Sequence, residues 1–147
     1  KKTSCLYIYI KMGNEVENWI RVKATDKRHI NEIVNNLHKQ GELDSYGYRD
    51  IVEYDNQFTA RATTKWNPPI DEFKQWLDRF PDIELYALYK EEYLHFAGRI
   101  EGNLQEHVDF ETVTSDDVRN ATSGLLFELN DKLYLAEHMD DEMRNDN

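Results

Sequence analysis

Hydrophobic and polar residues alternate in several short stretches of this chain, and a period of two predicts β-strands with one buried face. The clearest stretch is Phe58 to Lys65, whose even-numbered residues are the less polar ones. Ile83 to Tyr89 and Tyr93 to Ile100 repeat the pattern, and the polar run Lys90 to Glu92 between them predicts the reversal of a hairpin. Weaker stretches predict three more strands, at Leu6 to Ile10, at Ile20 to Ala24, and at Ile51 and Val52 before a turn at Asp55-Asn56.

Two stretches instead carry apolar residues at the spacing of an amphipathic helix. The stripes are Ile30, Ile33, Val34 and Leu37 in the first, and Ile70, Phe73, Leu77 and Phe80 in the second. We expect Thr25 or Asp26 to cap the first helix, and Asn67 to cap the second with Pro68 at its first position. Pro81 prevents the second helix from continuing.

The predicted order is strand, helix, strand, strand, helix, strand, strand. This order is typical of an α+β, ferredoxin-like split βαβ fold, an antiparallel sheet with two helices on one face. An extra N-terminal strand and a C-terminal extension would be added to it. No linker divides the 147 residues, so we expect a single domain, 1–147, with its ferredoxin-like core at 18–102 and an acidic extension at 103–147.

The extension gives weaker signals. Val108 to Thr112 alternates as a strand would, and Ser115 is suited to cap a short helix that stops near Gly124. Leu125 to Ala136 fits either a helix, by the spacing of its leucines, or a hairpin around Asn130-Asp131. The Asn-Asp pair favours the hairpin, because these residues suit tight turns better than helix interiors. Residues 139–147 read as a frayed acidic tail.

Several short elements resemble the YubB ferredoxin-like domain family. They are Thr64-x-Trp66-x-Pro68-Pro69, Phe80-Pro81-Asp82, Phe96-Ala97-Gly98, and Asn18-Trp19 before the first strand of that domain. The resemblance covers about residues 18–102. It implies a ferredoxin-like fold and a phage or plasmid setting, because family members are mostly proteins of mobile elements without an assigned activity. It carries no catalytic residues over to this chain.

Charge is the most unusual global property. The net charge is −11, and residues 101–147 alone carry thirteen acidic and three basic side chains. This balance argues against direct binding to nucleic acid, which needs cations to displace counterions from phosphates. It favours a basic partner, or serves solubility alone. The candidate partner-binding carboxylates are Glu101, Glu106, Asp109, Glu111, Asp116, Asp117, Glu128, Asp131, Glu137, Asp140, Asp141 and Glu142.

No pattern for catalysis or for a cofactor stands out. The six glycines are scattered and form no phosphate-binding loop, and the five histidines show no metal-ligand spacing, so we predict no cofactor and no metal. His95, His107 and Asp109 could meet across strands as a metal site, but exposed polar residues on a sheet are the commoner outcome. Cys5 is the only cysteine, which excludes an intrachain disulfide, and no apolar run approaches about 18 residues. A cytoplasmic protein that is not an enzyme is the expectation.

Tyrosines are predicted to gather on the sheet face opposite the helices. The candidates are Tyr7, Tyr9, Tyr86 and Tyr93. Aromatic residues on such a face stack on bases in RNA-binding domains, but here the companion cations are sparse. We expect the residues after Gly102 to cover this face, or the face to bind protein.

Two functions therefore stay open. The first is a non-catalytic acidic module that binds a basic, nucleic-acid-handling protein such as a nuclease. It would act as an accessory or anti-defence inhibitor. Mimicry of nucleic acid is one form that this function can take. The alternative is a small-ligand-binding ferredoxin-like domain with a concave pocket lined by a few convergent polar groups. A homodimer is compatible with either function.

Overall fold

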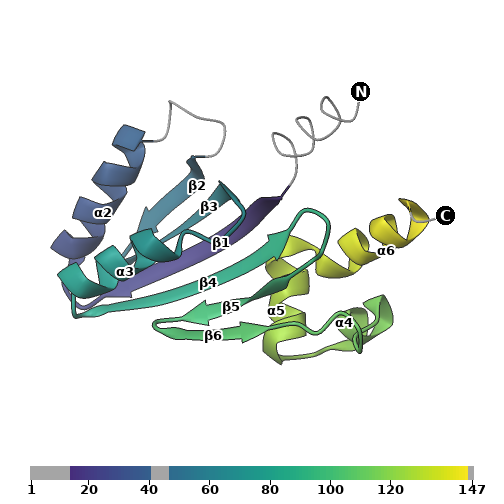
Figure 1. Cartoon of the computed structure of the whole chain (residues 1–147). Coiled ribbons are helices and arrows are strands. Elements are labelled where there is room, and N and C mark those ends of the chain that lie inside the picture. The colour runs from purple at the N-terminus through teal and green to yellow at the C-terminus, as the bar shows by residue number, and fades with distance from the viewer. Residues whose placement is uncertain (1–13, 41–46, 146–147) are drawn as a thin grey trace, which may run out of the picture.

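The computed structural model of the chain describes residues 14–40 and 47–145. Its elements follow in the order β1 (Glu15–Ala24), α2 (Lys27–Gln40), β2 (Tyr48–Tyr54), β3 (Gln57–Lys65), α3 (Ile70–Arg79), β4 (Ile83–Glu91), β5 (Ala97–Glu101), β6 (Leu104–His107), α4 (Ser115–Asn120), α5 (Gly124–Leu133) and α6 (Leu135–Asn145). The strands form a six-stranded antiparallel sheet in the order β2-β3-β1-β4-β5-β6 (Figure 1). The predicted α+β class is confirmed. The predicted strand Leu6 to Ile10 lies outside the described residues.

One face of the sheet packs against α2 and α3. The even-numbered residues of β1 point to this face, as do the odd-numbered residues of β4 from Ile83 to Ala87. The buried side chains between these layers are Val16, Ile20, Val22, Ala24, Ile30, Ile33, Val34, Leu37, Phe58, Ala60, Ala62, Phe73, Phe80, Ile83, Leu85, Ala87, Tyr89 and Ile100. They include both helical stripes of the sequence apart from Ile70 and Leu77, which are half-buried against the same core.

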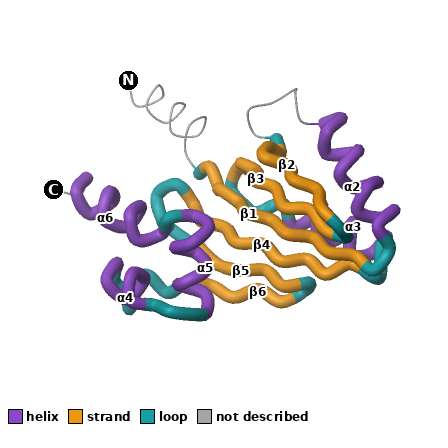
Figure 2. The backbone as a smooth tube through the Cα atoms, turned by 180° about the vertical axis from the view of Figure 1, so that it is seen from behind, coloured by secondary structure: helices purple, strands orange, loops and turns teal. Residues whose placement is uncertain are grey.

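The opposite face is covered in part by the C-terminal helices. Figure 2 shows α5 in front of β4 and β5, with α3 behind the sheet and α2 beside the edge strand β2. A second core joins Leu88 and Ala97 of the sheet to the helices, with Trp19 and Tyr86 packed against it. Its helical members are Val118, Leu129, Leu133, Leu135 and Ala136. The expected cover from residues after Gly102 therefore reaches Tyr86 only in part. Tyr93 is exposed, and Tyr7 and Tyr9 lie outside the described residues.

The segment Leu125 to Ala136 forms helices, so the favoured hairpin is wrong. Asn130 and Asp131 lie inside α5, and the chain breaks instead at Tyr134, which has a left-handed φ of 55°. Asn130 Oδ1 accepts the backbone N–H of Ala136 at 3.0 Å and so satisfies a donor of the first turn of α6. Burial of Leu129 and Leu133 on the second face outweighs the local turn preference. Residues up to Asn145 continue as α6, not as a frayed tail.

Four local predictions also differ. The polar run Lys90 to Glu92 is not the reversal, because β4 continues to Glu91 and the turn follows it. The last strand is β6, and residues 108–112 form a loop. Asn67 does not cap α3, since Pro69 holds the N-cap position without a side-chain hydrogen bond. Asn18 and Trp19 lie within β1 and not before it.

Gly98 shows a local constraint in the Phe-Ala-Gly element. A Cβ built at Gly98 would overlap the Glu106 carbonyl oxygen and the Tyr89 hydroxyl group. The Tyr89 hydroxyl accepts a hydrogen bond from Gln105 Nε2 at 2.9 Å and contacts His107 Nδ1 at 2.9 Å. The absence of a side chain at Gly98 therefore lets Tyr89 reach the β6 edge of the sheet.

Candidate functional site

A polar cleft of about 320 Å³ lies where β1, β2, β3 and β4 meet α6. We call it the Lys90 cleft, and its lining residues are Glu15, Glu17, Arg49, Thr63, Lys90, Glu92 and His138. Strand register brings the sheet residues together, because Glu17 lies directly opposite both Thr63 and Lys90 across neighbouring strands. His138 comes from the distant C-terminal helix. The cleft thus joins the two ends of the described chain.

Lys90 is the most buried charged group of this cleft, with a side chain only 9% exposed. Burial lowers its pKa, because a charged ammonium loses hydration inside the protein. Glu17 opposes this shift, and so do Glu137 and Asp141 on α6. The distance from Lys90 Nζ to Glu17 Oε2 is 4.0 Å, which is an ion pair but is longer than a hydrogen bond.

Glu17 is shared among three cations. Arg49 Nη2 and Arg61 Nη1 each lie 3.9 Å from Glu17 Oε1, in addition to Lys90 on the other oxygen. Arg49 Nη1 also donates to Thr63 Oγ1 at 2.8 Å, which fixes its side chain at the cleft. Positive and negative groups are thus interleaved across four strands, and none of these ion pairs is close enough for a hydrogen bond to Glu17.

A carboxyl group and an imidazole, those of Glu92 and His138, also line the cleft. His138 Nε2 lies 2.7 Å from the Glu92 carbonyl oxygen. Since a carbonyl only accepts, Nε2 carries the proton and Nδ1 is an acceptor. Burial lowers the pKa of His138, and the charge of Lys90 lowers it further. Burial also raises the pKa of the Glu92 carboxyl group. Glu92 Oε2 and His138 Nδ1 are buried without a hydrogen-bond partner among the described residues.

Glu91, next to the cleft, has a structural role. Its side chain is fully buried and accepts the backbone N–H groups of Tyr93 and His95, each at 2.9 Å. His95 Nδ1 lies 2.9 Å from the same carboxylate. Glu91 therefore holds the turn between β4 and β5, and this turn positions Glu92 at the cleft.

The twelve predicted partner-binding carboxylates lie in the hairpin of β5 and β6, the following loop, and α4, α5 and α6. Many have local partners. Arg99 binds Glu101 and Glu106, and Arg119 binds Asp116 and Asp140. Asp117 and Thr114 form a capping box at α4, and hydrogen bonds from Thr114 lower the Asp117 pKa.

The remaining predicted carboxylates divide between turns and helices. Asp109 accepts the backbone N–H of Glu111 at 3.0 Å, and Asp131 lies 3.4 Å from Lys132 Nζ. Glu142 lies 3.8 Å from His138 Nε2, near the Lys90 cleft. Glu128 lies near Tyr86, while Glu137 and Asp141 act on Lys90. The structure therefore brings Glu137, Asp141 and Glu142 together at one site. It spreads the others over β5, β6, the following loop and the C-terminal helices, the segment from Glu101 onward that we call the C-terminal layer.

The three residues suggested as metal ligands do not come together in the structure. His95 contacts Glu91, whereas His107 contacts Tyr89, and Asp109 caps its own turn. No group of three or more His, Cys, Asp or Glu in the described ranges is arranged to hold a metal ion.

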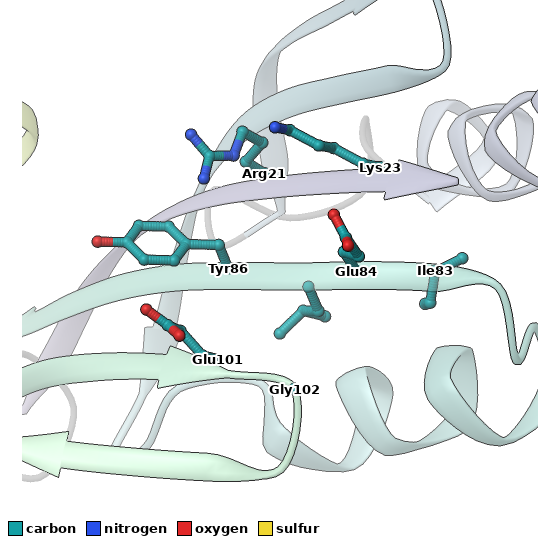
Figure 3. Close-up of a pocket in the computed structure, with 8 residues that line it drawn as sticks. Arg21, Lys23, Ile83, Glu84, Tyr86, Glu101 and Gly102 are labelled. Carbon is teal, nitrogen blue, oxygen red and sulfur yellow. The ribbon is translucent and has the colours of Figure 1, made fainter. Parts of the chain in front are cut away.

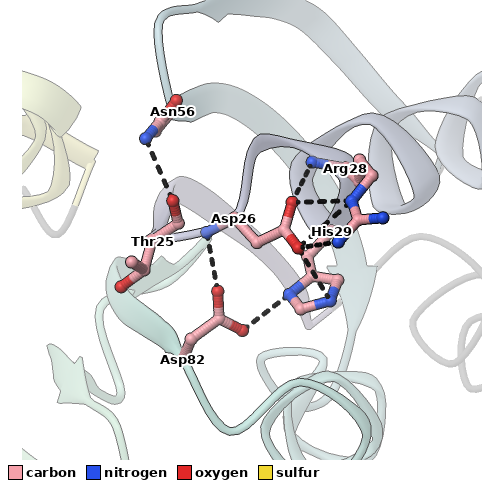
Figure 4. Close-up of polar contacts among 6 residues, drawn as sticks. All are labelled: Thr25, Asp26, Arg28, His29, Asn56 and Asp82. Atoms are coloured by element: carbon pink, nitrogen blue, oxygen red, sulfur yellow. Dashed lines mark hydrogen bonds and ion pairs between the residues drawn. The ribbon is translucent and has the colours of Figure 1, made fainter.

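A polar cluster joins the start of α2 to the end of α3 (Figure 4). His29 Nδ1 lies 2.7 Å from Asp82 Oδ1, and Asp82 Oδ2 accepts the backbone N–H of Asp26 at 2.9 Å. Asp26 caps α2 as predicted, with its Oδ1 accepting the backbone N–H of Arg28 at 2.9 Å. Hydrogen bonds from Arg28 lower the Asp26 pKa to about 2. Asp82 joins the two helical segments and Asp26 caps α2, so both carboxylates have structural roles.

The uncovered part of the second sheet face forms a shallow hollow of about 470 Å³ (Figure 3). Arg21 lies over the Tyr86 ring, with 4.9 Å from the guanidinium carbon to the ring centroid. Lys23 is opposite Glu84 across β1 and β4. In this hollow Arg21 thus has an aromatic partner and Lys23 has a carboxylate opposite it. Fewer polar groups are left for a ligand than in the Lys90 cleft.

No family model, curated protein or solved structure matches the chain. Among the helices that the structure describes, none has the length and apolar character needed to cross a membrane.

Sequence reasoning missed the Lys90 cleft. Lys90 was assigned to a surface turn, and His138 showed no spacing that linked it to another residue. One signal was available: Lys90 continues the alternation of Tyr86 and Leu88 on the second face. That phase places a charged side chain on a face that the C-terminal helices partly cover.

Proposed function

We propose that this protein is a non-catalytic binding module built on a ferredoxin-like split βαβ unit, residues 15–91. The strand order β2-β3-β1-β4 supports this topology, with α2 joining β1 to β2 and α3 joining β3 to β4. Strands β5 and β6 extend the sheet beyond β4, and α4, α5 and α6 follow them. The C-terminal layer is therefore an addition to the compact unit.

The proposed partner is a basic, nucleic-acid-handling protein that binds the C-terminal layer. The supporting observation is its charge: thirteen acidic side chains against three basic ones in residues 101–147. Arg119 and Lys132 are already in ion pairs with carboxylates of the same layer. Exposed carboxylates include Glu111, Asp116 and Asp131. Such a field accelerates association with a cationic surface and selects against acidic partners.

Mimicry of nucleic acid is the strictest form of this proposal. Double-stranded DNA presents one charge per about 1.7 Å of axis, so a mimic needs closely spaced carboxylates. The pairing of Asp116 and Asp140 with Arg119 reduces the density available around α4. Attraction between an acidic surface and a basic partner does not require this close spacing of carboxylates. We propose this simpler form of binding.

The test is affinity capture of nucleic-acid-binding proteins on the immobilised full chain, with increasing salt. We expect a basic partner that salt releases and that nucleic acid displaces. The variant Glu111→Gln, Asp116→Asn, Asp131→Asn should lose most of this binding. A matched control, Glu53→Gln, Asp78→Asn, Glu84→Gln, removes three exposed carboxylates elsewhere and should retain it. Binding that ignores salt, or that the two variants change equally, would contradict the proposal.

A further inference from the structure

The Lys90 cleft contains hydrogen-bonding capacity that the described chain does not use. Glu92 Oε2 and His138 Nδ1 are both buried acceptors without a donor, and both residues line the cleft. Leaving such a group unsatisfied is unfavourable, and most buried polar atoms in native proteins are hydrogen-bonded to protein or to water. Two such acceptors at one place therefore favour the binding of a donor. Solvent does not reach either atom in this arrangement. A ligand donor would therefore enter with a small rotation of the Glu92 side chain.

The other side of the cleft offers donors. The Lys90 side chain is nine-tenths buried, and the 4.0 Å contact of its ammonium group with Glu17 is too long for a hydrogen bond. Arg49 lines the same cleft. A ligand acceptor that reached Lys90 would form a charge-assisted hydrogen bond in a partly dehydrated place, where such bonds are strong.

The two sides together select the ligand class. A simple anion would meet Lys90 and Arg49 but would be repelled by Glu15, Glu17 and Glu92. A simple cation would be attracted by these carboxylates but repelled by Lys90. Only a ligand with both signs of charge matches both sides, with its ammonium toward Glu92 and His138 and its carboxylate toward Lys90.

The dimensions fit a small molecule of this kind. Lys90 and Glu92 flank Glu91, the last residue of β4, and both line the cleft, so the groups that would hold the two charges of a ligand belong to one place. A molecule whose ammonium and carboxylate are attached to one carbon has its two charges close together, as such a place requires. The cleft volume of about 320 Å³ lies at the lower end of the range for small-ligand pockets.

We propose that the Lys90 cleft binds a free α-amino acid, held between Lys90 on one side and the Glu92–His138 pair on the other. This site is separate from the acidic surface that is proposed to bind a basic protein. Either function can fail without the other.

The first experiment titrates the isotope-labelled full chain with each of the twenty protein amino acids and follows the backbone amide resonances. We expect saturable shifts for at least one amino acid, centred on residues 15–17, 63, 90–92 and 138. The deaminated carboxylic acid and the decarboxylated amine of that amino acid serve as probes of each half. Each should bind at least tenfold more weakly than the whole molecule.

Variants then test the two sides. Lys90→Met and Glu92→Gln should each weaken binding at least tenfold. The controls Lys23→Met and Glu84→Gln change the same residue types in the hollow of the same sheet face and should bind as the native chain does. If Lys90→Met does not fold, Lys90→Arg replaces it, and the resonance map of the native chain still locates the site.

Three results would overturn the proposal. One is the absence of saturable shifts with all twenty amino acids. Another is equal binding of the carboxylic acid or the amine alone, which would show a site for one charge only. The third is a set of shifts that lies away from the cleft, or native affinity in both Lys90→Met and Glu92→Gln.

Discussion

The two faces of the sheet differ in how completely they are covered. Against α2 and α3, the sheet presents an almost unbroken set of apolar side chains, including Ile20, Phe58 and Leu85. It includes the buried polar residue Asn18, whose amide nitrogen donates to the Val16 and Ala62 carbonyls, each at 3.1 Å. The Asn18 amide nitrogen is thus hydrogen-bonded, whereas its Oδ1 is buried without a partner among the described residues.

The second face mixes apolar and charged side chains along the same strands. Trp19 and Leu88 pack under the C-terminal helices, whereas Arg21 lies outside the helical cover and Lys90 at its margin. Charged groups at such a margin lose part of their hydration without losing access to a ligand. The comparison teaches that a charged residue on a partly covered sheet face marks a place where pKa values shift and where a cleft can form.

Truncation of the first core should give the largest effect. Phe58 is fully buried, and its ring contacts Trp76 edge to face with the centroids 6.2 Å apart. Phe58→Ala leaves a cavity that a closely packed layer cannot refill, so we expect a loss of about 3–5 kcal/mol in the free energy of unfolding. Urea unfolding followed by circular dichroism measures it. The control Val52→Ala changes a half-exposed side chain. An equal loss in the free energy of unfolding of this variant would contradict the view that the first core dominates stability.

Truncation of the second core should cost less and act more locally. Leu129 is fully buried between α5 and the sheet. We expect Leu129→Ala to lower the free energy of unfolding by about 2–4 kcal/mol. It should also accelerate amide hydrogen exchange in α5 and α6 more than in α2, because segments with smaller cores open first. Leu104→Ala, at an exposed position, is the control. Equal acceleration in α2 would show that the two faces unfold as one unit.

The smallest expected effect is a pH dependence at the margin of the second face. His138 has a lowered pKa in the folded state, so the unfolded state takes up the proton first as the pH falls. Stability is therefore retained above the ordinary histidine pKa of about 6.5 and declines below it, until the folded state is also protonated. Glu92 acts in the opposite direction at lower pH, because its raised pKa favours protonation of the folded state.

Unfolding midpoints in urea between about pH 7.5 and pH 5.5 measure the His138 contribution. His138→Gln keeps a donor for the Glu92 carbonyl and should flatten the decline. His38→Gln, at an exposed position of α2, should leave it unchanged. A decline of equal slope in the native chain and in His138→Gln would show that other groups cause it.

The parts of the fold that the sequence predicts correctly are those in which local pattern and burial agree. In β3, α2 and α3, the period of the apolar residues matches the element that forms. Asp26 marks the start of α2, and Pro81 follows the end of α3. In α5 the two signals conflict. Asn130-Asp131 favours a turn locally, but the leucines of the same segment reach a buried face only as a helix. The candidate carboxylates could be counted from the sequence, whereas their partners could not. Arg99 binds Glu106 because the two residues are opposite in the register of β5 and β6.

The sequence by itself determined the alternation of the strands, the two helical stripes and the concentration of acid in the last third of the chain. These properties depend on neighbours within a few residues, where spacing decides which side chains share a face. Only the tertiary structure decided that Lys90 is buried, that it faces Glu17, and that His138 lines the same cleft. Burial and electrostatic interaction depend on distances between segments that are far apart in the chain, and strand register and helix packing fix those distances.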